Sequence, residues 1–470
     1  MADTHKEDVN GPLYSPNDAR DPVERRASAT QPDAHAEKSK DGEQRGGVLA
    51  RVSAFLAIIL PPGSIAASAF NVASTTIGAG IFGLPSAANS SGLVMAMIYL
   101  ICFYVSTIFS IYCLALAADR AGVHSYEGVA RALLGRKGQY TVAVIRAIFG
   151  FSACVAYVIT VGDIFSASVK NSDASDFLKR PAGRRLITFI LWACLMLPLV
   201  IPRRIDSLRH VSTFAVVFMV YVVGIVVVHS CTNGLSENVK DVSVGRSDEA
   251  AIVLFNSGNK AIGGLGVFIF SFLCQITSLE VYADMKDRTL TRFMVATAVG
   301  LFLCYILYAA TALFGYLDFG SAVTGSVLLM YDPVAEPAVM VGYVGVFIKL
   351  CASYALLFMS FRNAIYNAVG WDSDRVVFWK HCLFVLSLST VVLLCGLFIP
   401  KINTVFGFAG SICGGSLGFI FPALFLMYAG QFTWTKVGPL LYIVTYFLLI
   451  CGVCAVVFGT GATILDAVSG

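Results

Sequence analysis

A glycine-rich motif lies in the first apolar stretch of the chain. Residues 78–83 have the sequence GAGIFG, which satisfies the pattern G-x-G-x-x-G of dinucleotide-binding loops, where glycines let the backbone approach a pyrophosphate. That chemistry requires a preceding strand and an acidic residue about 20 positions further on. Here small and apolar residues precede the motif, and the first acid after it is Asp119. The glycines therefore favour a use other than nucleotide binding.

Two other uses of these glycines are open. Small residues let membrane helices pack closely. Alternatively, Gly78 and Gly80 interrupt a helix in mid-membrane and leave backbone amides and carbonyls unpaired. Irregular backbone persists at that depth only where it is buried in protein or lines a cavity. We favour the interrupted helix, which predicts a cavity beside the motif.

The composition of the chain is that of a membrane protein. Of its 470 residues, 57% are apolar and only 13% are charged, and the mean hydropathy is +0.76. A soluble protein carries about a quarter charged residues. The net charge of +4 is not gathered into a basic face, so we predict no nucleic-acid partner. The lipid bilayer is the expected surrounding.

Apolar segments of about 20 residues follow one another along most of the chain, and most are long enough to cross the bilayer as helices. We predict an all-α integral membrane protein with about eleven transmembrane helices. Their expected ranges are 67–90, 92–117, 141–168, 186–201, 211–230, 261–283, 293–317, 338–361, 378–399, 402–428 and 438–460. Two regions result, a tail over 1–63 and a transmembrane domain over 64–470.

The tail is of a different composition. Its first fifty residues hold ten acids, seven bases and a single aromatic, Tyr14, so the tail cannot bury a core and is expected to be disordered. Basic residues gather in the loops that lie on the tail's side of the membrane, although 170–185 is an exception. By the positive-inside rule the tail is cytoplasmic. We expect a multi-pass protein of the plasma membrane.

A second interrupted helix is expected in the sixth segment. Residues 263–271 contain four glycines or serines, and polar Gln275, Thr277 and Ser278 follow near the centre. Transporters built from inverted repeats place their binding site between two discontinuous helices at corresponding positions of the two halves. The first and sixth segments lie five helices apart, which predicts a five-plus-five inverted repeat.

At these residues the sequence resembles the amino acid/auxin permeases of the amino acid-polyamine-cation superfamily. The resemblance rests on IGAGIFGLP within 71–85, on YVITVGD at 157–163, and on FSFLCQ at 270–275. The overall character is similar to that of the trypanosomatid amino acid permeases. The resemblance implies transport of amino acids by a five-plus-five inverted repeat, and it leaves the particular amino acid open.

The two interruptions together suit a zwitterionic solute. Amides at the start of a half-helix attract an anion such as a carboxylate, and carbonyls at the end of a half-helix accept hydrogen bonds from an ammonium group. The candidate substrate-binding residues are Thr75, Thr76, Gly78, Ala79, Gly80, Ile81, Phe82, Phe270, Ser271, Phe272 and Gln275. For Phe270 and Phe272, an ordinary packing role is an equal alternative.

Ionisable residues inside apolar helices are the next candidates, because a charge costs about 2.5 to 3.5 kcal/mol at a helix centre on insertion scales. Asp163 could attract a cation or form a structural contact, Glu280 could recognise a basic side chain, and Arg146 could extend to the interface. Sodium-coupled relatives hold a cation between the first and eighth helices, where this chain has Lys349 and Ser353. We hypothesise that the Lys349 ammonium replaces sodium; alternatively, it pairs with a carboxylate.

The predicted function is secondary active transport of amino acids by alternating access, driven by protons or membrane potential. Asp163 and Glu280 incline the substrate weakly towards a cationic amino acid, arginine or lysine. A permease for neutral amino acids and an amino acid receptor without transport are the alternatives. The sequence shows no catalytic constellation, and we expect neither an enzyme nor a bound cofactor or metal.

Overall fold

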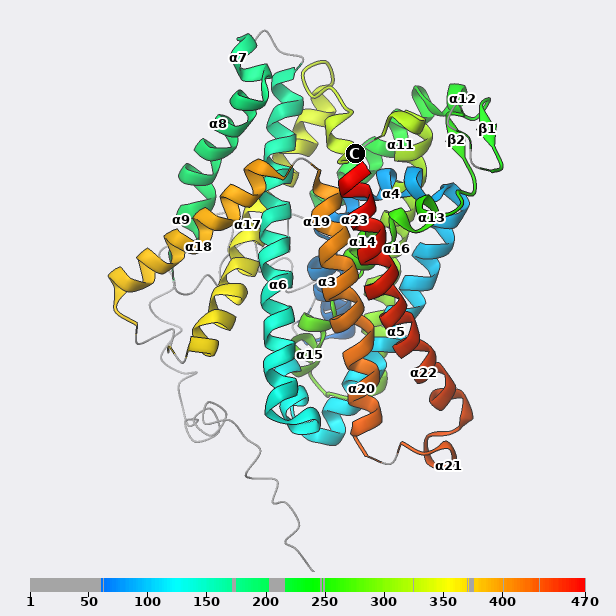
Figure 1. Cartoon of the computed structure of the whole chain (residues 1–470), viewed down its shortest axis with the longest axis vertical. Coiled ribbons are helices and arrows are strands. Elements are labelled where there is room, and N and C mark those ends of the chain that lie inside the picture. The colour runs from blue at the N-terminus through cyan, green and yellow to red at the C-terminus, as the bar shows by residue number, and fades with distance from the viewer. Residues whose placement is uncertain are drawn as a thin grey trace, which may run out of the picture. The chain divides into compact units, whose positions relative to one another are not determined.

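The computed structural model describes residues 61–469, apart from 62, 171–174, 203–215, 246, 248–249, 324, 370, 372–375, 400 and 431. The tail predicted over 1–63 lies almost wholly outside the described residues. In the described part nearly every element is a helix (Figure 1). The prediction of an all-α membrane protein is confirmed.

The helices vary widely in length. The long ones are α5 (Leu93–Ala121), α6 (Tyr126–Lys170), α16 (Leu290–Phe319), α17 (Pro337–Val369), α18 (Phe378–Phe398), α11 (Val216–Thr232) and α22 (Pro439–Cys454). The shorter ones are α3 (Ile65–Thr76), α4 (Leu84–Ser91), α7 (Asp176–Lys179), α8 (Pro181–Leu191), α9 (Leu197–Val200), α12 (Leu235–Asn238), α13 (Asn259–Gly263), α14 (Leu265–Ser271), α15 (Gln275–Ala283), α19 (Ile402–Phe408), α20 (Phe421–Tyr428), α21 (Trp434–Val437) and α23 (Thr460–Ser469).

Turns of other helical types join several of these pieces. Tight 3-10 turns are η1 (Ala79–Gly83), η3 (Gly320–Ala322) and η4 (Val327–Leu329), and wider π-helical segments are η2 (Trp192–Met196), η5 (Ala409–Ile420) and η6 (Ala455–Gly459). The π-helical segments continue the neighbouring helices, so α19, η5 and α20 form one span.

The helices agree with the predicted apolar segments. Nine helical stretches within the described residues are long and apolar enough to cross a membrane, a tenth candidate is bent by 53° at its break, and α11 is a shorter apolar helix. Each predicted segment overlaps one of these. Eleven crossings and the inverted repeat themselves stay predictions.

Two regions differ from the expected pattern. Helix α6 begins at Tyr126 rather than near 141, because the charged residues before 141 continue the helix across a kink at Gly135, where φ is 74°. The connection expected over 231–260 contains the strands β1 (Val242–Ser243) and β2 (Ile252–Val253), which pair in parallel register. A pattern of charge alone does not distinguish a loop from a helix that leaves the membrane.

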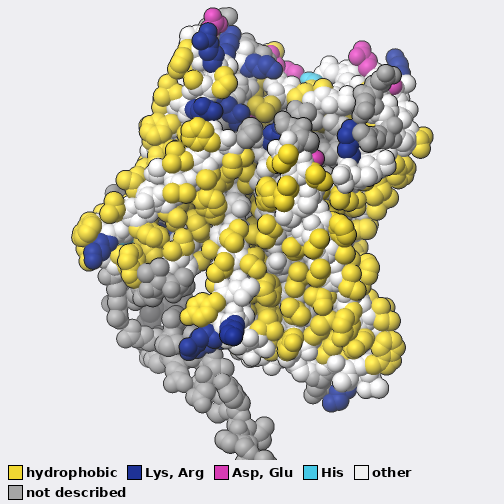
Figure 2. All heavy atoms as spheres, viewed as in Figure 1, with side chains coloured by type: hydrophobic (Ala, Val, Ile, Leu, Met, Phe, Trp, Pro, Cys, Tyr) yellow, Lys and Arg dark blue, Asp and Glu magenta, His cyan; other side chains and the backbone are white. Residues whose placement is uncertain are grey.

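The packing of the long helices positions the site. Helix α16 packs along α3 and α5, and α17 packs along α6. Figure 2 shows apolar side chains over much of the flank of the described part, as expected for a surface that contacts lipid. Exposed examples are Ile101, Val105 and Leu440. Because the flank is apolar, polar side chains in the interior are the candidates for a functional site.

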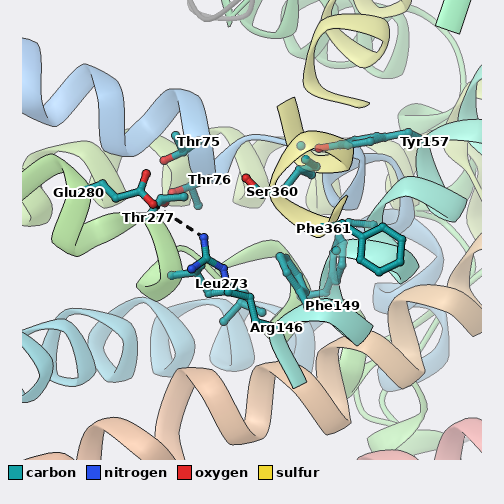
Figure 3. Close-up of a pocket in the computed structure, with 16 residues that line it drawn as sticks. Thr75, Thr76, Arg146, Phe149, Tyr157, Leu273, Thr277, Glu280, Ser360 and Phe361 are labelled. Atoms are coloured by element: carbon teal, nitrogen blue, oxygen red, sulfur yellow. Dashed lines mark ion pairs between the residues drawn. The ribbon is translucent and has the colours of Figure 1, made fainter. Parts of the chain in front are cut away.

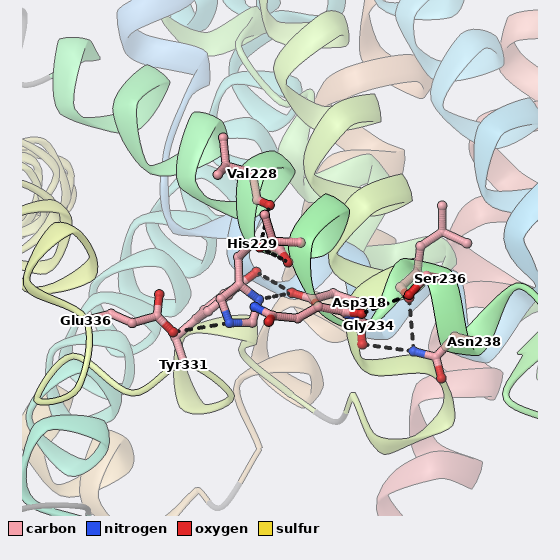
Figure 4. Close-up of polar contacts among 11 residues, drawn as sticks. Val228, His229, Gly234, Ser236, Asn238, Asp318, Tyr331 and Glu336 are labelled. Atoms are coloured by element: carbon pink, nitrogen blue, oxygen red, sulfur yellow. Dashed lines mark hydrogen bonds and ion pairs between the residues drawn. The ribbon is translucent and has the colours of Figure 1, made fainter.

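A polar cluster joins three elements at the end of the bundle that carries β1 and β2, here called the loop end (Figure 4). The Asp318 carboxylate lies 2.6 Å from Nδ1 of His229 and accepts hydrogen bonds from the Gly234 amide and the Tyr331 hydroxyl. Nε2 of His229 lies 3.2 Å from a carboxylate oxygen of Glu336. These contacts hold α11, α16 and the segment before α17 together.

Candidate functional site

The first interruption separates α3 from α4. Helix α3 ends at Thr76, and both Ile77 and Gly78 have extended backbone before the turn η1 begins at Ala79. Gly78 has no side chain that could cap the new helical start, and the leading amides of a helix have no acceptor within it. The helix interruption predicted from the glycine motif is therefore present.

The second interruption is shallower. Helix α14 ends at Ser271 and α15 begins at Gln275, and between them the amides of Phe272 and Leu273 bond to carbonyls only three residues back. The predicted end of a half-helix near Phe270 to Phe272 is thus observed. The last carbonyls of α14 form a negative helix end.

The two interruptions touch each other. A Cβ atom added to Gly80 would lie 2.7 Å from Oγ of Ser271 and 3.2 Å from the ring of Phe270. A larger residue at Gly80 would have to displace the Ser271 hydroxyl and press on the Phe270 ring. The glycine motif therefore permits a close approach between helix ends rather than binding of a nucleotide.

A cavity opens beside both interruptions (Figure 3). Its wall carries five of the predicted residues, Thr75, Thr76, Gly78, Phe270 and Glu280. The other lining residues are Arg146, Phe149, Gly150, Ala153, Tyr157, Leu273, Ile276, Thr277, Leu357, Ser360 and Phe361. Hydroxyl groups and the break at Gly78 thus combine with aromatic and aliphatic walls.

The sequence analysis did not single out most of the lining residues, although their spacing carried a signal. Phe149, Gly150, Ala153 and Tyr157 lie three, four, seven and eleven residues after Arg146, so the five residues share one face of α6. The intervals within α15 and α17 are similar. A search for a stripe that mixes aromatic, small and polar residues on helices facing the interruptions would have found them.

The charged residues of the cavity pair with one another. Arg146 lies 2.6 Å from a carboxylate oxygen of Glu127 and 3.8 Å from one of Glu280. Figure 3 shows Arg146 and Glu280 pointing toward each other. The end of the bundle that carries Arg146 and Glu280 is here called the cavity end. Arg146 does not simply extend to the interface, because its guanidinium group belongs to the cavity wall.

Asp163 lies elsewhere and has a partner. The carboxylate is buried, and Oδ1 lies 2.5 Å from Nη2 of Arg184 on α8. The ion pair joins α6 to α8, which is the structural alternative considered for Asp163. Asp163 is not among the residues that line the cavity.

Lys349 reaches the first interruption from α17. Its ammonium nitrogen lies 3.1 Å from the carbonyl oxygen of Ser74, in the last turn of α3, and its side chain is 2% exposed. A cation at the carboxyl end of a helix is favoured by the helix dipole. Ser353, four residues further on, is also buried.

Gln275 is occupied by contacts outside the cavity wall. The side-chain oxygen Oε1 of Gln275 accepts a hydrogen bond from the backbone amide of Cys274. Its side-chain nitrogen Nε2 lies 3.4 Å from the Gly418 carbonyl oxygen and 3.5 Å from the Ser110 hydroxyl oxygen. The remaining candidates Ala79, Gly80, Ile81, Phe82, Ser271 and Phe272 are buried and are not among the residues that line the cavity.

Two discontinuous helices beside a cavity are typical of one class of membrane carrier, whose binding site lies between such helices. The chain matches the family described as "Transmembrane amino acid transporter protein" over residues 61–465 and belongs to that family. The resemblance found in the sequence is confirmed.

Two relatives extend this result. The "Sodium-coupled neutral amino acid transporter 7" of Xenopus laevis is 26% identical over 383 residues, which cover 78% of this chain and 81% of the relative. The "Sodium-coupled neutral amino acid symporter 2" of Danio rerio is 24% identical over 419 residues, which cover 84% of this chain and 82% of the relative. Both are named as carriers of neutral amino acids.

Proposed function

We propose that this transporter carries small neutral amino acids by alternating access, with the amino acid bound where the two interruptions meet. The observation that carries the proposal is the cavity beside Gly78 and Phe270, which joins main-chain polar groups to apolar walls. Main-chain groups recognise what all amino acids share, and the walls select the side chain.

The two charges of the amino acid have separate positions in this proposal. The amides that follow Gly78 attract the carboxylate, because they begin a helix that has no capping side chain. The carbonyls that end α3 and α14 accept hydrogen bonds from the ammonium group. Thr75, Thr76 and Phe270 line the space between these two positions.

The charge distribution supports a neutral side chain and gives no support to the expected preference for arginine or lysine. Glu280 faces Arg146 across the cavity, so its charge is offset, and Asp163 is paired with Arg184. The walls near the interruptions consist of Phe149, Leu273 and Phe361 with other apolar residues. The names of both relatives agree with this choice.

Uptake by purified protein in proteoliposomes tests the substrate. Labelled L-alanine is competed in turn by the other nineteen amino acids, and we expect inhibition by small neutral amino acids and little inhibition by arginine or lysine. Strong inhibition by lysine alone would contradict the proposal. Counterflow of labelled substrate also separates the classes, because a channel or a receptor shows no trans-stimulation.

The driving ion is a separate proposal. We propose that the Lys349 ammonium holds the position of a coupling cation, so that a co-transported proton, driven by its gradient and by the membrane potential, replaces sodium. Its contact with the Ser74 carbonyl at the negative end of α3 supports this. Both relatives are named as sodium-coupled, so sodium coupling is the alternative to this proposal.

A sodium gradient imposed alone tests this point. We expect L-alanine uptake to be unchanged by that gradient and to respond to a proton gradient or to membrane potential. Lys349→Met, which removes the charge at similar length, should abolish the response to those two forces. A steep rise in wild-type uptake with sodium alone would refute the role given to Lys349 and would leave the substrate proposal intact.

The orientation is also proposed. We place the cavity end in the cytoplasm and the protein in the plasma membrane, because Lys286, Arg288 and Arg292 follow α15 on that side. An epitope tag on the tail should be inaccessible to antibody in intact cells and accessible after permeabilisation. Surface biotinylation of intact cells tests the choice of membrane.

A further inference from the structure

Tyr308 on α16 contacts both interruptions at once. Its hydroxyl oxygen lies 2.9 Å from the carbonyl oxygen of Thr76 and 2.9 Å from that of Ser271. The side chain is completely buried, and its ring packs edge-on against Phe272 at a centroid distance of 5.2 Å. One side chain thus links two helix ends that are far apart in the sequence.

This link contains fewer hydrogen-bond donors than acceptors. Thr76 and Ser271 are the last residues of α3 and α14, and carbonyls in the last turn of a helix lack intrahelical donors. Each helix end also carries a partial negative charge. A tyrosine hydroxyl has a single hydrogen to donate. One donor therefore serves two acceptors at the meeting point of two helix ends, and the Lys349 ammonium contacts α3 at the Ser74 carbonyl, two residues before Thr76.

A substrate ammonium group supplies what this point lacks. It carries a positive charge and three N–H donors, like the ammonium of a lysine side chain. Thr76 lines the cavity, so an amino acid bound there brings its ammonium group close to these carbonyls. With the ammonium present, the two ends no longer depend on the hydrogen of Tyr308.

Building on the proposed function, we propose that Tyr308 is a positioning residue for the empty carrier. Its hydroxyl holds the ends of α3 and α14 together while no ammonium group is bound, and the substrate takes over that role in the loaded carrier. The hydroxyl therefore matters most in the step in which the carrier returns empty across the membrane.

Measurements of net uptake and of exchange distinguish the empty carrier from the loaded carrier. Net uptake requires the empty carrier to return, whereas exchange of labelled for unlabelled substrate involves only loaded transitions. We expect Tyr308→Phe to lower net uptake about tenfold, because buried carbonyls lose their donor in the empty state. Exchange should stay within about twofold of wild type. A residue that only supported the fold would lower both rates together.

Tyr316→Phe is the matched control. Tyr316 is a second fully buried tyrosine on α16, and its hydroxyl accepts a hydrogen bond from the Val253 amide, away from the interruptions. This variant should keep the wild-type ratio of exchange to net uptake. Both rates are measured on the same proteoliposomes with the neutral amino acid that the wild-type protein takes up fastest.

The outcomes are distinct. An unchanged ratio in Tyr308→Phe overturns the role of Tyr308, while exchange by the wild-type protein still supports the proposed function. If Tyr308→Phe is poorly folded, excess substrate during expression and purification should restore its yield, because the defect belongs to the empty state. Failure of substrate to restore the yield, with normal yield of Tyr316→Phe, also overturns the proposal.

Discussion

The two ends of the helix bundle hold their charged side chains differently. At the loop end, the Asp318 side chain is 1% exposed and has three partners from two other segments. At the cavity end, the Glu280 side chain is 63% exposed and lies 3.8 Å from Arg146. The Asp318 carboxylate is thus buried and densely bonded, whereas the Glu280 carboxylate is exposed and lies near the limit of ion-pair distance from Arg146. We propose that the carrier is closed at the loop end and open at the cavity end, and this difference between the two carboxylates supports that proposal.

The comparison predicts that the loop end contributes far more to stability than the cavity end. The largest effect is expected for Asp318→Ala, which removes the acceptor of His229, Gly234 and Tyr331. Removing a buried carboxylate that accepts several hydrogen bonds leaves its donors unsatisfied and costs about 3 kcal/mol. Thermal unfolding of the purified protein measures the loss as a lowered Tm.

Asp241→Ala is the control for this change. Asp241 is exposed at the same end, and its carboxylate accepts a hydrogen bond from the amide of Ala251. Its loss should cost about 1 kcal/mol or less. Equal losses from the two variants would remove the distinction drawn for the Asp318 cluster.

Alkaline pH provides a second way to probe the loop end. Burial, and next the nearby Asp318 carboxylate, raise the pKa of Tyr331 far above its ordinary value. Above pH of about 10 the unfolded chain releases this proton while the folded protein retains it. The stabilisation is therefore complete below that pH and is lost above it, by about 1.4 kcal/mol per pH unit.

Tyr331→Phe should lessen this alkaline loss. The variant lacks the titrating hydroxyl, so its Tm should fall less steeply than that of wild type between about pH 10 and 11. Other tyrosines titrate in both proteins, and the difference between the two curves reports on Tyr331. Parallel curves would show that the site is wetter than the structure indicates.

Most of the helices could be predicted from the sequence, and the site only in part, for physical reasons. Long apolar runs indicate membrane helices from local sequence alone, and the glycines around Gly78 indicate an interruption. The partners of Asp163 and Glu280 could not be predicted, because Arg184 and Arg146 reach them only after the helices pack. An unpaired acid and a paired one look alike in a sequence, which is why the cationic substrate was favoured.

The main-chain part of the site shows the same limit. That the two interruptions lie close together, as Gly80 and Ser271 do, could be expected from the two local glycine- and serine-rich stretches and the predicted repeat. The role of Gln275 was not, because its amide contacts Ser110 on α5 and Gly418 in a π-helical segment. Nothing in the sequence near Gln275 indicates those partners.

The cavity end offers the smaller effects. Glu127→Gln removes the closer partner of Arg146, at 2.6 Å, where both side chains are largely buried. We expect a loss of about 1 kcal/mol, the upper part of the range for partly exposed pairs. Thermal unfolding at low and high salt checks this, since added salt should shrink the difference from wild type. A salt-independent loss would point to packing instead of charge.

Glu280→Gln should have the smallest effect on stability of the variants compared. The long separation from Arg146 and the exposure of Glu280 limit the expected loss to about 0.5 kcal/mol or less. If this end closes during transport, however, the pair shortens and loses water, and its energy rises. Glu280→Gln should then slow L-alanine uptake several-fold while Tm hardly changes. A large drop in Tm would mean that Glu280 already belongs to a closed network, and the two ends would no longer differ in the way the exposed and buried carboxylates indicate.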